Sequence, residues 1–291
     1  MASANTLNGP LIQADSLVER VDDPQVCFLD ATWIAPFLDP DTKGRELFDK
    51  QHIAHAQFFD IDAIADQSSD LPHMLPTPIE FGQALSELGV RNDQFVVCYD
   101  QNNYVASARA WWMMRVMGHE RVAVLNGGLK AWLAAGGKTS TGAQSTGNAI
   151  PSDYSASFRP ELLARLDQVQ NDVRQNSRII LDARSQARFS GSAPEPRAGL
   201  SSGHMPNALN VPSGEFINED GLFKSNAELK ALFDTIGVDV ENGQFITTCG
   251  SGVTAAIISL ALASLGQDDV ALYDGSWSEW GQAADCPFVT D

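Results

Sequence analysis

Residues 245–260 read Phe-Ile-Thr-Thr-Cys-Gly-Ser-Gly-Val-Thr-Ala-Ala-Ile-Ile-Ser-Leu, two apolar runs separated by a short turn rich in glycine. The first run fits a buried strand, and the small and branched residues from Val253 onward fit a buried helix. A strand that becomes a helix within so few residues aims successive backbone N–H groups into the space above the turn. These groups and the helix N-terminus both favour the thiolate of Cys249, so the stretch predicts a reactive cysteine. A small, inert, buried cysteine is the alternative.

The composition is that of a globular, acidic chain. Its 291 residues suffice for two domains, and 44% of them are hydrophobic while 19% are charged. The formal charge of −18 argues against nucleic acid or an anionic membrane as a partner, so any anionic substrate needs local cations. Residues 1–17 lack the pattern of a leader, and no apolar run approaches the ~20 residues that span a bilayer. We therefore expect a soluble, cytoplasmic protein.

The cysteines do not form a recognisable framework. Neither a disulfide scaffold nor a zinc site is indicated, because the four cysteines are widely spaced without a C-x-x-C pair. They are Cys27, Cys98, Cys249 and Cys286. We expect them to be reduced, and no cofactor or metal is required by any motif.

Four landmarks occur twice, in the same order, at offsets of 152, 152, 150 and 148 residues. They are Phe28–Ala31 with Ile179–Ala183, His52–Ala56 with His204–Ala208, Phe95–Cys98 with Phe245–Thr248, and Val122–Gly127 with Val270–Gly275. A drift of only four residues over four landmarks indicates a duplicated domain.

Each half alternates short apolar runs with amphipathic segments, which favours parallel strands joined by helical crossovers. The predicted fold class is α/β, with two tandem domains, each a mostly parallel sheet flanked by helices. A stretch rich in Ser, Thr, Gly and Ala connects the halves. We therefore expect an N-terminal domain at 1–140, a linker at 141–160 and a C-terminal domain at 161–291.

The duplication provides an internal control for the cysteine. At the corresponding turn the first half has Tyr99 or Asp100, depending on where a one-residue gap is placed. Cys98 falls opposite Thr248 and is expected to be a core residue. Only the second half can therefore use a thiol at this turn.

Three arginines follow the strand that ends at Asp182, in a segment bounded by proline and glycine. In α/β proteins such loops hold ligands, and arginine is suited to a bidentate grip on a carboxylate. The arginines are Arg184, Arg188 and Arg197. We expect Arg184 to hold the loop together, and for each of the three a surface charge or a structural ion pair is the alternative.

The duplicated frame, the C-G-S-G-V-T loop at 249–254, the stretch Phe59–Asp62, the stretch His73–Pro76 and the stretch Asp274–Trp277 resemble the two-domain rhodanese family. The resemblance runs from about Ala14 to Trp280. Within the family, the sequence resembles more specifically the branch that uses 3-mercaptopyruvate. In that branch Gly-Ser-Gly follows the cysteine, whereas the thiosulfate branch usually carries basic residues there. The resemblance implies a non-catalytic N-terminal rhodanese-like domain and a catalytic C-terminal one.

The resemblance also implies roles for individual residues. Cys249 is the nucleophile, and Ser251 works with Asp62 of the other domain, for which Asp60 is the alternative. The substrate-binding positions are Arg188, Arg197, His73, Gly250, Gly252, Val253 and Thr254. From the residues alone, the Ser251 hydroxyl could act as a proton relay or as a donor to the substrate, with a helix cap as the alternative, and His73 fits a structural loop residue.

The expected reaction takes sulfur from 3-mercaptopyruvate, stores it on Cys249 as a persulfide and releases pyruvate. The acceptor is a thiol, such as thioredoxin or a small thiol, or cyanide. Three other functions compete. A thiosulfate:cyanide sulfurtransferase is disfavoured by the neutral loop, a Cys-x5-Arg phosphatase by Ala255, and a non-enzymatic rhodanese-like interaction module by the presence of Cys249. A two-glycine match to a dinucleotide motif at Gly250 and Gly252 is weak.

Overall fold

The computed structural model describes residues 7, 9–143 and 151–291, which form two compact units. The first unit contains residues 1–64 and 76–158, and the second contains residues 65–75 and 159–291. The expected linker at 141–160 is described except for residues 144–150, which lie outside the described residues. Among the helices of the described ranges, none has the length and hydrophobicity needed to cross a bilayer.

The first unit contains a five-stranded parallel sheet with the strand order β1-β6-β5-β2-β4. In that order the strands are Leu11–Ile12, Val122–Leu125, Phe95–Tyr99, Val26–Asp30 and Gln57–Phe58. The α-helices are α1 (Gly44–Lys50), α2 (Ile61–Ile64), α3 (Pro78–Glu87), α4 (Ser107–Val116) and α5 (Gly128–Ala134). A separate antiparallel pair joins β3 (His52–Ile53) to β7 (Thr139–Ser140).

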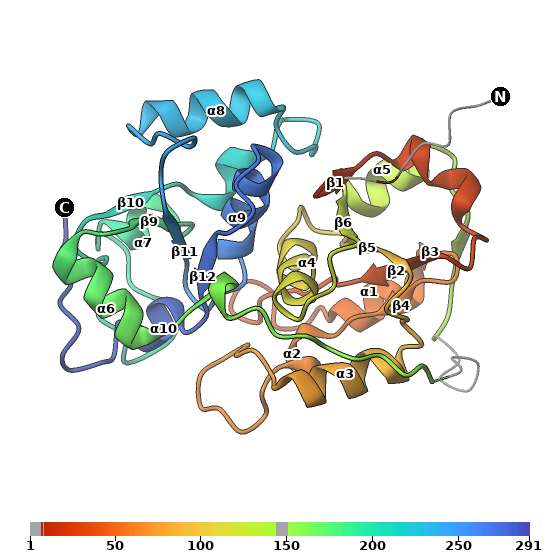
Figure 1. Ribbon diagram of the computed structural model, residues 1–291, viewed down its shortest axis with the longest axis horizontal. Coiled ribbons are helices and arrows are strands. Elements are labelled where there is room, and N and C mark those ends of the chain that lie inside the picture. The colour runs from red at the N-terminus through yellow and green to blue at the C-terminus, as the bar shows by residue number, and fades with distance from the viewer. Residues whose placement is uncertain (1–6, 8, 144–150) are drawn as a thin grey trace. The chain divides into compact units, whose positions relative to one another are not determined.

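The second unit repeats this topology, with the parallel order β10-β9-β11-β12-β8. In that order the strands are Ala208–Asn210, Ile179–Asp182, Phe245–Thr248, Ala271–Tyr273 and Leu163–Ala164. The α-helices are α6 (Leu166–Gln175), α7 (Gln186–Phe189), α8 (Asn226–Thr235), α9 (Ala255–Ser264) and α10 (Ser276–Trp280). Helices α6 and α10 cover one face of the sheet, and α8 and α9 cover the other (Figure 1). The predicted α/β class and the duplication are confirmed.

Burial explains why these segments adopt these elements. The central strand β11 is buried at all four positions, as a parallel strand covered on both faces requires. Helix α9 is buried from Ala255 to Ala263, so its apolar sequence packs on every side. Helices α3 and α8 each begin with a capping box, Thr77 with Glu80 and Ser225 with Glu228.

Strand pairing corrects one alignment made from the sequence. The offset of 150 places Cys98 opposite Thr248, but Asp30 pairs with Tyr99 where Asp182 pairs with Thr248. The bond from Ala31 N to Tyr99 O (2.8 Å) likewise matches the bond from Ala183 N to Thr248 O (2.9 Å). Strands buried on both faces lack an alternating pattern, so an alignment by apolar character slips by one residue without penalty. Asp100 therefore occupies the position of Cys249.

Candidate active site

Cys249 follows β11 directly, and its loop leads into α9. The cysteine is only 2% exposed. Gly252 has a φ of +74°, a left-handed conformation that glycine adopts without strain and most other residues avoid. The glycine after Ser251 is thus required by the tight turn between strand and helix.

The start of α10 holds this loop in place. The Oγ of Ser276 accepts hydrogen bonds from the N–H groups of Cys249 (3.2 Å) and Gly252 (3.1 Å), and it donates to the carbonyl of Tyr273 (2.8 Å). Ser278 donates from both its N–H (2.8 Å) and its Oγ (2.7 Å) to the carbonyl of Gly250. The loop conformation is therefore fixed by a neighbouring helix and not only by its own glycines.

Several N–H groups of the loop have no internal acceptor. Within the part of the chain that the structure describes, no acceptor is found for the N–H groups of Gly250, Ser251, Val253 and Thr254. Buried N–H groups of a protein normally have a partner, and those at the start of a helix favour negative charge. The loop therefore has the chemistry of an anion-binding turn beside the Cys249 sulfur.

In the first unit, the corresponding turn after β5 surrounds an acidic side chain of the chain itself, that of Asp100. Asp100, which occupies the position of Cys249, is buried, and its Oδ1 accepts from the N–H groups of Asn102 (3.3 Å) and Tyr104 (2.9 Å). Its Oδ2 accepts from the N–H groups of Ala106 (3.2 Å) and Ser107 (2.9 Å). The turn in the first unit thus surrounds an acidic side chain with four N–H donors.

Arg188 lies against the cysteine loop. A Cβ at Gly250 would meet the Arg188 Nη2 at 2.8 Å, so the absence of a side chain at Gly250 makes room for the guanidinium. Nε and Nη2 of Arg188 are both bonded to Glu195, at 3.2 Å and 2.5 Å, whereas Nη1 has no acceptor among the described residues. The expected bidentate carboxylate is therefore Glu195 of the chain itself, and Nη1 is the part of Arg188 that remains for a ligand. The Arg188 side chain is 22% exposed.

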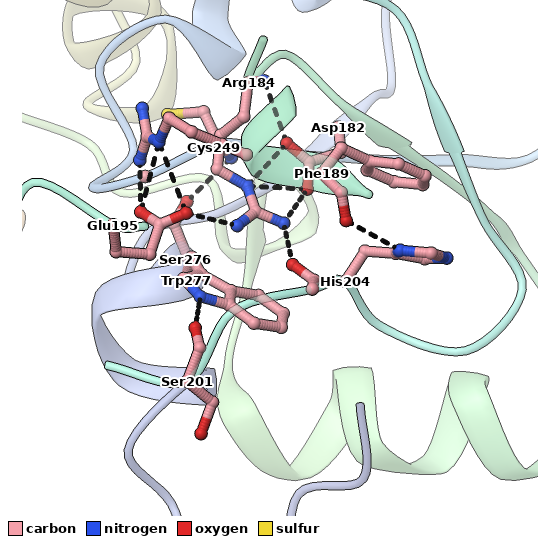
Figure 2. A network of polar contacts seen from close by, with 12 residues as sticks. Asp182, Arg184, Phe189, Glu195, Ser201, His204, Cys249, Ser276 and Trp277 are labelled. Carbon is pink, nitrogen blue, oxygen red and sulfur yellow. Dashed lines mark hydrogen bonds and ion pairs between the residues drawn. The ribbon is translucent and has the colours of Figure 1, made fainter. Parts of the chain in front are cut away.

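Arg184 holds the arginine segment to the sheet, as its position after Asp182 suggested (Figure 2). Its side chain is fully buried, with Nη2 bonded to Asp182 (2.7 Å), Nη1 bonded to Glu195 (2.8 Å), and the guanidinium 4.2 Å from the Trp277 ring centroid. Burial opposes the charged form, but the ion pairs with Asp182 and Glu195 outweigh it and raise the pKa of Arg184. Arg184 is thus a permanent cation with a structural role.

The structure brings His73 and Arg197 together, although 124 residues separate them in the chain. Both belong to the second unit, and the Arg197 Nη2 lies 3.5 Å from the His73 Nε2. The segment that carries His73 is fixed by a bond from Leu75 N to Asp274 Oδ2 (2.7 Å). His73 has a φ of +61°, which marks a tightly constrained loop position.

Ser251 is buried, and no hydrogen bond of its hydroxyl to another described residue is found. Thr254 is the N-cap of α9 and makes no side-chain capping bond, so Ser251 does not act as the helix cap that its turn position allowed. Asp62 lies in the first unit on α2 and is exposed; its Oδ2 accepts from the Trp33 Nε1 (2.7 Å). Asp60 accepts from the N–H groups that begin α2, which is a capping role.

Sequence reasoning missed two residues of this site. Glu195 is a single acidic residue between two prolines in a segment with three arginines, and that isolation was the available signal. Ser276 belongs to the stretch Asp274–Trp277, which resembles the rhodanese family, but no sequence pattern links it to the Cys249 loop 27 residues earlier. The other three cysteines lack an environment that favours the thiolate: burial raises the pKa of Cys98 and of Cys286, and it raises the pKa of Cys27 to about 12.

The described residues include no cluster of three His, Cys, Asp or Glu side chains able to hold a metal ion.

A family model described as the Rhodanese-like domain matches residues 13–135 and 161–283, and the chain belongs to this family.

Individual relatives are similar over nearly the whole chain. The 3-mercaptopyruvate sulfurtransferase of Escherichia coli K12 is 43% identical over 277 residues, which are 95% of this chain and 96% of that protein. The thiosulfate sulfurtransferase of Rattus norvegicus is 38% identical over 93% of this chain and 90% of the rat protein. The crystal structure of SseA from Escherichia coli, which presents the rhodanese fold of 3-mercaptopyruvate sulfotransferases, matches with a TM-score of 0.83 and 40% identity. It covers 94% of this chain and 100% of the SseA chain.

Proposed function

We propose that the protein is a sulfurtransferase that takes sulfur from 3-mercaptopyruvate, carries it on Cys249 and passes it to a thiol acceptor or cyanide. The observation that carries the proposal is the comparison of the two turns. The first unit places an acidic side chain among four N–H donors. The second unit places a cysteine at the same position, and the N–H groups of Gly250, Ser251, Val253 and Thr254 have no acceptor among the described residues. A thiolate and a persulfide are the anions that this second turn suits.

In the first half-reaction the thiolate of Cys249 attacks the thiol sulfur of 3-mercaptopyruvate. An S–S bond forms, the C–S bond breaks, and its electron pair remains on carbon as the enolate of pyruvate. The thiol proton passes to that carbon, which gives pyruvate and leaves Cys249 as an anionic persulfide. The thiolate before the attack and the persulfide after the proton transfer both carry their negative charge beside the loop, so the same N–H groups stabilise both.

The residues around the loop then take distinct roles. Nη1 of Arg188 and the side chain of Arg197 bind the donor carboxylate and ketone oxygen, with His73 beside Arg197. Ser251 and Asp62 move the proton. The backbone of Gly250, Gly252, Val253 and Thr254 lines the site. On this proposal residues 161–291 form the catalytic domain, residues 1–140 the non-catalytic one and residues 141–160 the linker.

In the second half-reaction an acceptor attacks the outer sulfur of the persulfide and releases the Cys249 thiolate. A thiol R–SH leaves as R–S–SH, and cyanide leaves as thiocyanate. Thioredoxin or a small thiol is the acceptor we propose, in the cytoplasm, where the four free cysteines stay reduced. Nucleic acid and membrane are not among the proposed partners, given the charge of −18.

Thiosulfate is the second candidate donor, because a thiosulfate sulfurtransferase is among the similar proteins. The loop after Cys249 is Gly-Ser-Gly and carries no cation, which favours the monoanionic donor.

The test is mass spectrometry of the protein after incubation with 3-mercaptopyruvate. We expect one added sulfur atom on the peptide that contains Cys249, and stoichiometric pyruvate. Cys249→Ser should show neither while keeping the thermal unfolding curve of the parent, and Cys286→Ser, which removes a thiol bonded to Gln170, serves as the control. Turnover retained by Cys249→Ser would remove Cys249 from the reaction.

A further inference from the structure

Glu195 occupies a position between two guanidinium groups (Figure 2). Its side chain is 1% exposed, and both carboxylate oxygens are engaged by Arg188 while Oε1 also accepts from the Arg184 Nη1 at 2.8 Å. A buried carboxylate with this many charge-assisted bonds is fixed in position, so it also fixes the Arg188 side chain.

The ionised side chains of this network balance. Asp182 and Glu195 carry two negative charges, and Arg184 and Arg188 carry two positive charges. The adjoining loop, residues 250–254, contributes no ionisable side chain. Arg188 reaches Gly250, next to the nucleophile, so a donor whose sulfur meets Cys249 comes to a cation that Glu195 has already neutralised.

We propose that Glu195 sets the charge of the sulfur donor that the site accepts, by cancelling the charge of Arg188 and thereby disfavouring dianions. This proposal rests on the sulfurtransferase function above. 3-Mercaptopyruvate brings one negative charge in its carboxylate, whereas thiosulfate brings two. A change of one unit in the charge of the site acts twice as strongly on the dianion as on the monoanion, because Coulomb energy scales with the product of charges.

Glu195 also has a geometric effect, which must be separated from its charge. It directs Nε and Nη2 of Arg188 toward itself and leaves Nη1 for the ligand. Glu195→Gln removes the charge and keeps the length of the side chain. Glu195→Asp keeps the charge and withdraws the carboxylate by one methylene group.

The experiment measures kcat/KM for thiosulfate and for 3-mercaptopyruvate with cyanide as acceptor. In Glu195→Gln we expect the ratio of thiosulfate to 3-mercaptopyruvate efficiency to rise about tenfold or more. In Glu195→Asp we expect both efficiencies to fall while the ratio stays within about threefold of the parent, since the charge is unchanged. Glu161→Gln is the control for a lost surface charge, because Glu161 is half exposed and paired with Arg159.

A second measurement needs no variant. Methanethiosulfonate is a monoanion that presents the same sulfonyl-bound sulfur as thiosulfate and leaves methanesulfinate when the Cys249 thiolate takes its outer sulfur. The parent enzyme should prefer it to thiosulfate by about tenfold or more, after both are normalised to their rates with free cysteine. An equal preference would overturn the proposal even if Glu195→Gln did not fold.

The outcomes separate the two proposals. If the parent forms no persulfide with 3-mercaptopyruvate, the proposed function fails. If it does form the persulfide and Glu195→Gln leaves the donor ratio unchanged, or Glu195→Asp changes it as much as Glu195→Gln, then charge cancellation by Glu195 is wrong and the function stands.

Discussion

Ser276→Ala should lower the free energy of unfolding of the second unit more than the removal of any other single hydroxyl in the cysteine loop or at the start of α10. The Oγ of Ser276 is fully buried, accepts from the N–H groups of Cys249 and Gly252, and donates to the carbonyl of Tyr273. Its loss removes one hydrogen-bond partner from each of four buried groups: the N–H groups of Cys249 and Gly252, the Thr248 hydroxyl and the Tyr273 carbonyl. Each such group costs ~1–3 kcal/mol, and partial relaxation brings the expected total to about 3 kcal/mol.

The assay is urea unfolding, with the melting temperature as a second readout. A loss of this size corresponds to a decrease of about 9 °C for a unit of this length. Ser278→Ala is the matched control: the Ser278 hydroxyl and its own N–H both donate to the carbonyl of Gly250, so that acceptor keeps a partner. We expect a cost of about 1 kcal/mol or less for the control.

Ser276→Gly adds a further discrimination. Ser276 has a φ of +49°, so glycine should recover about 1 kcal/mol of backbone strain relative to alanine, although it removes the same hydrogen bonds. The reasoning is refuted if Ser276→Ala unfolds at the same urea concentration as Ser278→Ala, because the hydroxyl would then not be holding the loop.

Two predictions concern the first unit. Asp100→Asn should lower the free energy of unfolding in urea by about 3 kcal/mol, because the amide NH2 group would face N–H donors from which a carboxylate oxygen now accepts hydrogen bonds. Asp23→Asn, at an exposed turn, is the control. Equal effects of the two substitutions would contradict a special role for the buried acid. Burial lowers the pKa of His119. As pH falls below about 6.5, the unfolded chain therefore takes up a proton that the folded chain refuses, and stability declines down to the folded-state pKa. His119→Gln should flatten the decline in unfolding free energy between pH 7 and pH 5, and an unchanged slope would exclude this histidine as its source.

The repeated strands and their connections could be predicted because they depend on local patterns. Apolar runs such as Ile179–Asp182 have no other stable position than a buried parallel strand, and two copies of each landmark reinforce the interpretation. The cysteine loop was predictable for the same reason, since the turn chemistry is written in consecutive residues around Cys249.

The partners of the site residues could not be predicted. Arg188 was expected to bind a ligand carboxylate, but which of several acids neutralises an arginine depends on how a loop folds back, and Glu195 lies only seven residues away. The grouping of residues 65–75 with the second unit could not be predicted either, because contacts such as the bond from the Leu75 N–H to the Asp274 carboxylate join distant residues and leave no periodic signal in the sequence. The register slip at Cys98 arose where a uniformly apolar strand offers no reference position.

The excursion of residues 65–75 into the second unit has a consequence for synthesis of the chain. The ribosome delivers this segment before residue 159 of its own unit exists, and at about 5–20 residues per second the wait for the whole second unit lasts on the order of 10–40 s. During that time the first unit can fold, but residues 65–75 lack the rest of the unit to which they belong. The bond between the Leu75 N–H and Asp274 can therefore form only after residue 274 has been synthesised, so the second unit is completed by joining a segment made early to one made late.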